Sequence, residues 1–262
     1  MAGDRDCVID VNGQGIAVRR IPAPSNLGEP APILVFLHEG LGCVGMWKDF
    51  PDALSAATGC SALIYDRLGH GGSGPAETMR DLTYFENEAY SVLPALLSAS
   101  GVTDSILIGH SDGGTIALLH AGRARVRGVV TEAAHVFVEP ESRAGVAAAK
   151  SAWQDERFRK RLARYHGVGT EAMFTAWFDM WSAPWFQDWN IEDALPAIDC
   201  PVLAIQGNDD EYGTAAQVAA IARGVSGPVT TLLVAGCGHS PHIQARDVVL
   251  DRMAAFVRSL IE

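Results

Sequence analysis

Residues 105–114, SILIGHSDGG, combine a short apolar run with the pattern G-x-S-x-G centred on Ser111. The apolar run is typical of a buried strand, and the residues from Gly114 onward have the pattern of a helix. A serine between such a strand and such a helix lies on a sharp turn, where small neighbours let the chain pass closely. The turn lifts the serine oxygen above the sheet and points the backbone N–H of Asp112 at an oxyanion that forms there. The stretch therefore predicts a nucleophilic serine.

Short apolar runs alternate with helical patterns on both sides of this turn. We expect strands at 33–37, 62–65, 106–108, 126–131, 202–205 and 229–234, and helices at 46–57, 83–98, 113–121, 214–223 and 248–260. Pro94 lies inside the second helix and is expected to kink it. Nearer the N-terminus, two apolar runs around a turn at 12–15 predict a hairpin. Apolar strands alternating with helices are typical of an α/β fold with a mostly parallel sheet covered on both faces.

The composition changes between residues 139 and 199. Five of the six tryptophans lie in this segment, at positions 153, 177, 181, 185 and 189. The last four repeat every four residues, although Pro184 prevents one unbroken helix. We expect a helical cap over 139–199, lying on a core domain formed by 1–138 and 200–262. Most of its aromatic side chains are expected to pack the cap on the core, while Trp177 and Trp181 are candidates to line an apolar substrate pocket.

Charge and composition narrow the class of protein. The chain has 20 Lys and Arg against 31 Asp and Glu, a net charge of −11, which argues against binding to nucleic acid. Its longest apolar runs, such as Ile33–Leu37, are too short to cross a bilayer, so no membrane partner is expected. Charges at Met1–Asp6 stand where a signal peptide has its apolar core, which favours a cytoplasmic location. Five cysteines without metal-like spacing indicate reduced thiols and no metal site.

Four further motifs follow in order along the chain, each in a suitable context. They are HEGLG at 38–42, DRLGHGGS at 66–73, QGNDD at 206–210 and GCGHSPH at 236–242. Together with the Ser111 turn, they make the chain resemble the α/β-hydrolase family over nearly its whole length. The resemblance implies a central, mostly parallel sheet flanked by helices, with a cap insertion. It also implies catalytic residues in the chain order Ser, Asp, His.

A serine hydroxyl needs a base within hydrogen-bond reach, and that base needs an orienting acid. The resemblance places the base at His239, in the glycine-rich loop past the last expected strand, with His242 as the nearest rival. It selects Asp210 as the acid, three residues after the glycine of its motif. Asp209 is the next candidate. Glu132 is the third, because some members carry the acid at the end of the strand before the cap.

The oxyanion hole is expected to use the backbone N–H groups of Asp112 and, in the loop after His38, of Gly40. Glu39 departs from the commoner family pattern, which has glycine at this position, and it joins the candidate pocket residues. Its carboxylate either faces the site and repels anions, or turns away to a backbone N–H or an arginine. We favour the second arrangement, because a free carboxylate beside an oxyanion opposes catalysis.

The leading functional hypothesis is a cofactor-free serine hydrolase that cleaves a small apolar or aromatic carboxylic ester through an acyl-enzyme. An enol-lactone hydrolase and a carbon–carbon bond hydrolase of ring-cleavage products are alternatives with the same catalytic residues, as are a cofactor-free haloperoxidase and an acyltransferase. A non-catalytic ligand-binding protein on the same fold is the alternative from another class. The only partner expected is the small-molecule ester, and the sequence leaves monomer and homodimer open.

Overall fold

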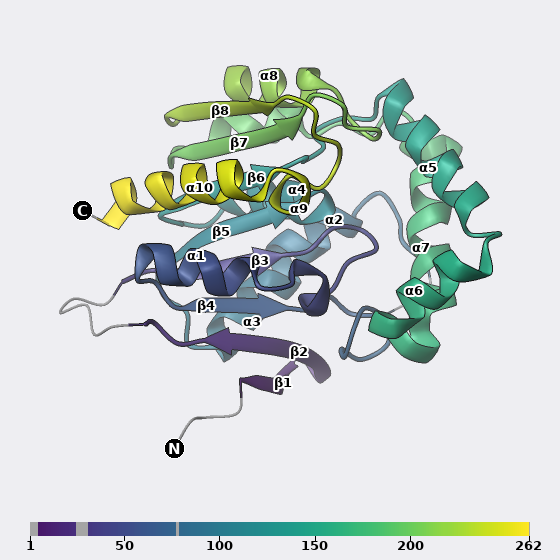
Figure 1. Ribbon diagram of the computed structural model, residues 1–262, viewed down its shortest axis with the longest axis horizontal. Helices are drawn as coiled ribbons and strands as arrows, with labels where there is room; N and C mark the ends of the chain where they lie inside the picture. The colour runs from purple at the N-terminus through teal and green to yellow at the C-terminus, as the bar shows by residue number, and fades with distance from the viewer. Residues whose placement is uncertain (1–4, 25–30, 77–78, 262) are drawn as a thin grey trace.

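The fold is built on a central sheet of eight strands in the order β1-β2-β4-β3-β5-β6-β7-β8 (Figure 1). The computed structural model describes residues 5–24, 31–76 and 79–261. The strands are β1 (Asp6–Val11), β2 (Gln14–Ile21), β3 (Ile33–Leu37), β4 (Ala62–Tyr65), β5 (Ser105–His110), β6 (Gly128–Glu132), β7 (Val202–Gly207) and β8 (Val229–Val234). β2 pairs antiparallel with β1 and with β4, and the strands from β4 to β8 are parallel. The predicted α/β fold class is confirmed.

Helices cover both faces of the sheet. Helices α1 (Phe50–Thr58), α9 (Pro241–Gln244) and α10 (Arg246–Ile261) lie on one face, and α2 (Tyr84–Asn87), α3 (Leu93–Ala99), α4 (Asp112–Ala121) and α8 (Ala215–Gly224) lie on the other (Figure 1). Two separate apolar clusters fill the spaces between these helices and the sheet. The central strands β3, β4, β5, β6 and β7 are buried almost throughout, which explains why their sequences show apolar runs without alternation.

Two expected helices differ in detail from the structure. The one expected at 46–57 begins as a separate 3₁₀ turn, because Lys48 has a φ of 56° and interrupts the helix before α1. The one expected at 83–98 passes from α2 through a π turn, Glu88–Val92, into α3. Pro94 follows this wider turn, and its nitrogen has no hydrogen to donate to an earlier carbonyl, so the change of helix type coincides with the predicted disruption.

Three helices follow β6 and form a layer of their own at one end of the sheet (Figure 1). They are α5 (Pro140–Ala152), α6 (Glu156–His166) and α7 (Thr170–Ser182). His166, at the end of α6, accepts a hydrogen bond from the backbone N–H of Gly71 (3.0 Å), and its other ring nitrogen lies 3.0 Å from the carbonyl oxygen of Leu41. Leu41 follows β3 and Gly71 follows β4, so the helical layer lies against the carboxyl ends of these strands.

Aromatic side chains join the helical segment to the rest of the protein. The rings of Trp181, Phe186 and Trp189 all pack on Phe85 of α2, with centroid distances of 6.2, 6.3 and 5.0 Å. The carboxylate of Glu139, just before α5, accepts hydrogen bonds from Thr214 and Gln217, which tie the start of the segment to α8. The segment is therefore held at several points along its length.

Candidate active site

Ser111 lies between β5 and α4 with a φ of 52°, a left-handed conformation that is strained for a residue with a side chain. Its backbone N–H donates to the carbonyl oxygen of Glu132 on the neighbouring strand (2.8 Å). A Cβ atom on Gly109 would overlap the backbone of Gly113, and one on Gly113 would overlap the carbonyl oxygen of Leu37. The sharp turn therefore requires both glycines of the G-x-S-x-G pattern.

Gly113→Ala is expected to lower the free energy of unfolding by about 3 kcal/mol or more, because the new methyl group meets a backbone carbonyl that cannot rotate away. Gly122→Ala, at the end of the same helix, is the matched control, since its φ is −72° and its nearest contacts lie at 3.4 Å. Urea denaturation of the two variants measures the difference. Equal stability of the two variants would contradict this account of the turn.

Ser111, His239 and Asp210 lie together and form a continuous chain of contacts. The Nε2 atom of His239 lies 3.0 Å from Oγ of Ser111, and its Nδ1 lies 2.9 Å from both carboxylate oxygens of Asp210. Asp210 also accepts hydrogen bonds from the backbone N–H of Tyr212 (2.8 Å) and from the side-chain amide of Gln206 (2.6 Å). These donors hold the carboxylate in one orientation behind the imidazole.

The pair of His239 and Asp210 changes the pKa of both groups. Burial works to lower the pKa of His239, but the hydrogen bond that its Nδ1 donates to Asp210 and the negative charge of that carboxylate outweigh burial, so the pKa lies above its ordinary value. Burial works to raise the pKa of Asp210, and the contact with His239 again outweighs it, so that pKa is lowered. The imidazole is therefore a stronger base than an isolated histidine, as proton abstraction from a hydroxyl requires.

The rival acids and the rival histidine occupy other places. Asp209 is exposed, and its backbone N–H donates to the carbonyl oxygen of Cys237. Glu132 is buried and its Oε2 lies 2.8 Å from Nδ1 of His242, whose backbone N–H also donates to it (2.9 Å). Glu132 and His242 thus form a second acid–histidine pair next to the first. In the structure Asp210 is the carboxylate that contacts His239.

The backbone N–H groups of Gly40 and Asp112 have no acceptor among the described residues. Asp112 is the first residue of α4, and its buried side chain lies 3.6 Å from a guanidinium nitrogen of Arg67, which is itself fully buried. The carbonyl oxygen of Gly40 lies 3.1 Å from Nε2 of His70, which holds the loop that carries this residue. Two unused N–H groups near a serine can accept the charge of an oxyanion.

Six buried histidines support the loops around Ser111 and the helices behind them, and we name them the neutral histidines: His38, His70, His110, His120, His135 and His166. A ring nitrogen of each lies within hydrogen-bond distance of a backbone group, such as the carbonyl oxygen of His239 for His110 (2.6 Å). Burial lowers the pKa of all six below the ordinary value, so the rings are uncharged. Three of them, His38, His70 and His110, lie within the motifs at 38–42, 66–73 and 105–114.

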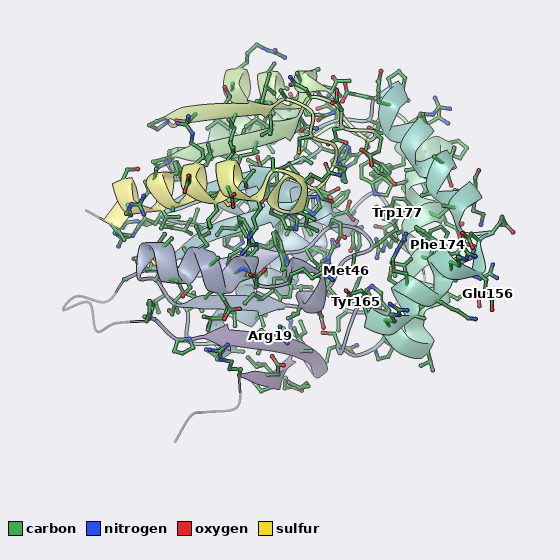
Figure 2. All side chains as sticks on the ribbon, viewed as in Figure 1. Arg19, Met46, Glu156, Tyr165, Phe174 and Trp177 are labelled. Atoms are coloured by element: carbon green, nitrogen blue, oxygen red, sulfur yellow. The ribbon has the colours of Figure 1, made fainter. Side chains whose placement is uncertain are left out.

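A cavity of about 340 Å³ opens beside Ser111 and His239. Trp177 and Trp181, the two tryptophans singled out in the sequence, both line it, and Figure 2 shows Trp177 on the side of α7 that faces the sheet. Sequence reasoning did not place several further lining residues there, among them Phe158 and Arg161 from α6 and Glu211 and Tyr212 from the loop after β7. The position of Tyr212, two residues after Asp210, was the one available signal for this set.

A larger open cavity of about 980 Å³ lies at the opposite, amino ends of the parallel strands. It is lined by residues that precede β5, β6 and β7, among them Thr103, Arg125 and Pro201. In parallel sheets with covering helices, ligands bind at the carboxyl ends of the strands, and none of Ser111, Asp210 and His239 borders this larger cavity. The smaller cavity is therefore the candidate active site.

Glu39 also lines the smaller cavity, and its carboxylate does not have the partner that the sequence led us to favour. No hydrogen bond or ion pair reaches this carboxylate from the parts of the chain that the structure describes. Burial raises its pKa to about 7. The structure thus lacks the contact with a backbone N–H or an arginine that we favoured, and Glu39 lines the candidate site without it.

Comparisons with known proteins identify the family and the fold. The sequence model of a family described as "Alpha/beta hydrolase family" matches residues 34–252. A proline iminopeptidase from Mycobacterium smegmatis is 18% identical with a TM-score of 0.75, and the match covers 97% of this chain and 98% of that one. An enol-lactonase from Burkholderia xenovorans LB400 is 20% identical (TM-score 0.73; 96% and 99% covered). The esterase RhEst1 from Rhodococcus sp. ECU1013 is 21% identical (TM-score 0.73; 98% and 100% covered).

A search of curated proteins found no match. Among the described residues, no cluster of three or more His, Cys, Asp or Glu side chains is suited to a metal ion. In the same part of the chain, the helices are all too short or too polar to cross a bilayer. The family match spans most of the sequence, and the solved structures share its fold over nearly the full length. The chain belongs to the alpha/beta hydrolase family.

Proposed function

We propose that the protein is a cofactor-free serine hydrolase of small carboxylic esters, with Ser111 as nucleophile, His239 as base and Asp210 as the orienting acid. The observation that carries the proposal is the unbroken chain of contacts from Oγ of Ser111 through both ring nitrogens of His239 to the buried carboxylate of Asp210. Ser111 and His239 border a cavity of about 340 Å³, which is large enough for a small substrate.

In this mechanism, His239 takes the proton of Ser111 while the serine oxygen attacks the ester carbonyl. The backbone N–H groups of Gly40 and Asp112 stabilise the tetrahedral oxyanion. The protonated His239 then gives its proton to the departing alkoxide, which leaves an acyl group on Ser111. A water molecule, deprotonated by the same imidazole, attacks this acyl group and releases the carboxylic acid. Asp210 stabilises the imidazolium through both steps.

The walls of the cavity support a small apolar or aromatic substrate. Trp177 and Trp181 from α7 and Phe158 from α6 line the cavity on the side of the helical segment. Residues 139–199 would then act as a cap that covers the reacting ester and excludes water. Apolar walls with a few polar groups are typical of sites for small molecules.

A panel of p-nitrophenyl esters, from acetate to decanoate together with benzoate, tests the proposal. We expect turnover of the short and aromatic esters, and a sharp fall for decanoate because the cavity is small. A fluorophosphonate probe should label the protein once, and peptide mass mapping should place the label on Ser111. Absence of both turnover and labelling would overturn the hydrolase proposal and favour a binding role on the same fold.

A further inference from the structure

The backbone of Glu39 is fixed at the edge of the cavity. Its carbonyl oxygen accepts hydrogen bonds from a guanidinium nitrogen of Arg67 (2.7 Å) and from the N–H of Gly42 (3.0 Å), and it lies 2.7 Å from Nδ1 of His38. Three contacts to one oxygen leave this peptide group little freedom. The side chain therefore starts from a fixed point, and Glu39 lines both the cavity that contains Ser111 and a smaller one, of about 50 Å³, beside His110 and His242.

The loop leaves a space for the carboxylate of Glu39. A Cβ atom on Gly42 would coincide with this carboxylate, so only glycine at position 42 allows the side chain to lie there. Arg67 is the cation whose charge acts most strongly on this carboxylate, but its guanidinium group contacts Asp112 (3.6 Å) and the carbonyl oxygen of Glu39 instead. The carboxylate thus has a defined position and lacks a partner among the described residues.

A carboxylate in this position is costly unless something pairs with it. Burying an ionised group without a partner is unfavourable, which is why its pKa is raised to about 7. An unpaired carboxylate in this loop therefore lowers the stability of the folded protein, unless a bound molecule supplies a positive charge next to it. A ligand cation would remove the penalty through a charge-assisted hydrogen bond.

The other walls of the cavity also suit a cation. Glu211 adds a second carboxylate, one oxygen of which accepts the backbone N–H of His239 (3.2 Å). The aromatic rings of Trp177, Trp181 and Tyr212 offer faces that attract positive charge. Arg161 is the one lining residue of opposite sign; its side chain is exposed, and its guanidinium group lies over the ring of Phe158. The net charge of −11 draws cations toward the molecule as a whole.

We propose that Glu39 is a specificity residue that binds a protonated amino group of the substrate, so that the site selects amine-bearing esters and rejects those that carry a carboxylate. This assignment rests on the proposed hydrolase function, since it names the class of substrate for the same cavity. It also separates the ester hydrolase from the ring-cleavage alternative, because ring-cleavage products are acids and would bring a second negative charge next to Glu39.

Binding of three small aromatic probes tests the proposal without any catalytic step. Benzylamine (protonated at about pH 8), benzyl alcohol and phenylacetate are similar in shape and differ in charge. Calorimetric titration of the wild-type protein should show benzylamine binding at least about tenfold more tightly than benzyl alcohol, and phenylacetate most weakly. Glu39→Gln should weaken benzylamine binding by about 10- to 100-fold and strengthen phenylacetate binding.

Glu171→Gln is the matched control, since Glu171 is exposed on α7 and does not line the cavity. It removes the same charge and should leave the three affinities unchanged. Two results would overturn the proposal: wild-type protein that binds benzylamine no better than benzyl alcohol, or Glu39→Gln with unaltered selectivity. The wild-type comparison stands even if the variant does not fold. Failure of the hydrolase proposal shows itself separately, as absent ester turnover with the cation selectivity intact.

Discussion

Ser111→Ala is expected to lower the kcat for p-nitrophenyl ester hydrolysis by about 10⁵-fold, because the other serines that line the cavity, Ser142 and Ser240, lack the contact with His239. Oγ of Ser111 is the atom that His239 contacts (3.0 Å), and alanine leaves that imidazole without a proton to take. Residual turnover would come from the oxyanion donors and from binding alone. Steady-state kinetics on the benzoate ester, with the fluorophosphonate probe in parallel, measures the effect.

Ser105→Ala provides the matched control for this change. Ser105 is a buried serine at the other end of β5, and it does not border the cavity. Its replacement should leave turnover within about threefold of the wild type, a factor small enough to separate it from a catalytic loss. If Ser111→Ala kept most of its activity, the nucleophile assignment would fail. Circular dichroism of both variants checks that the fold is retained.

Asp210→Asn is expected to lower kcat by about 10⁴-fold, because an amide stabilises neither the imidazolium nor the tautomer with its proton on Nδ1. It should also move the pH profile. In the wild type the base is active when deprotonated, so activity rises as the pH passes the raised pKa of His239. Without the negative charge that pKa falls, so the acid limb of the kcat/KM profile moves to lower pH.

Asp209→Asn is the control for this prediction, since the two aspartates are adjacent in sequence and only Asp210 contacts His239. Because Asp209 is exposed, Asp209→Asn should leave both kcat and the acid limb of the pH profile close to their wild-type values. An equal loss in both variants would mean that charge in this loop, rather than the contact with His239, supports catalysis. The pH profiles of the two variants then distinguish the effect of the contact between Asp210 and His239 from the effect of negative charge in the loop.

Much of the fold, and the contacts among Ser111, His239 and Asp210, could be predicted from the sequence. Both depend on local sequence patterns. Apolar runs gave the buried strands, and glycine spacing marked the sharp turn at Ser111. The motifs that carried the resemblance placed the acid and the base after particular strands, where parallel topology brings their loops together. These parts of the molecule require only local sequence and a known order of elements.

The remaining contacts join residues that local patterns cannot relate. Glu132 and His242 lie 110 positions apart in the chain, and the pairing depends on how β6 and the last loop meet. Glu132 was a candidate acid for His239 because of its position at the end of a strand. Nothing in the sequence showed that its carboxylate would instead contact His242. The orientation of Glu39 likewise follows from the space that Gly42 leaves and from the prior contacts of Arg67.

The neutral histidines also determine how the molecule responds to acid. Each has an ordinary pKa near 6.5 in the unfolded chain. Below about pH 6.5, unfolding therefore adds protons, because burial lowers the pKa of all six rings in the folded state. Four groups with raised pKa act in the opposite direction, because each binds its proton more tightly in the folded state: Glu39, Asp66, Glu88 and His239.

Charging of these six rings favours the unfolded chain, so the free energy of unfolding falls as the pH drops below about 6.5. Urea midpoints at about pH 7 and about pH 6 measure this slope directly, and equal midpoints would contradict it. The rings that hold the loops around Ser111 in place thus also set the acid limit of the protein.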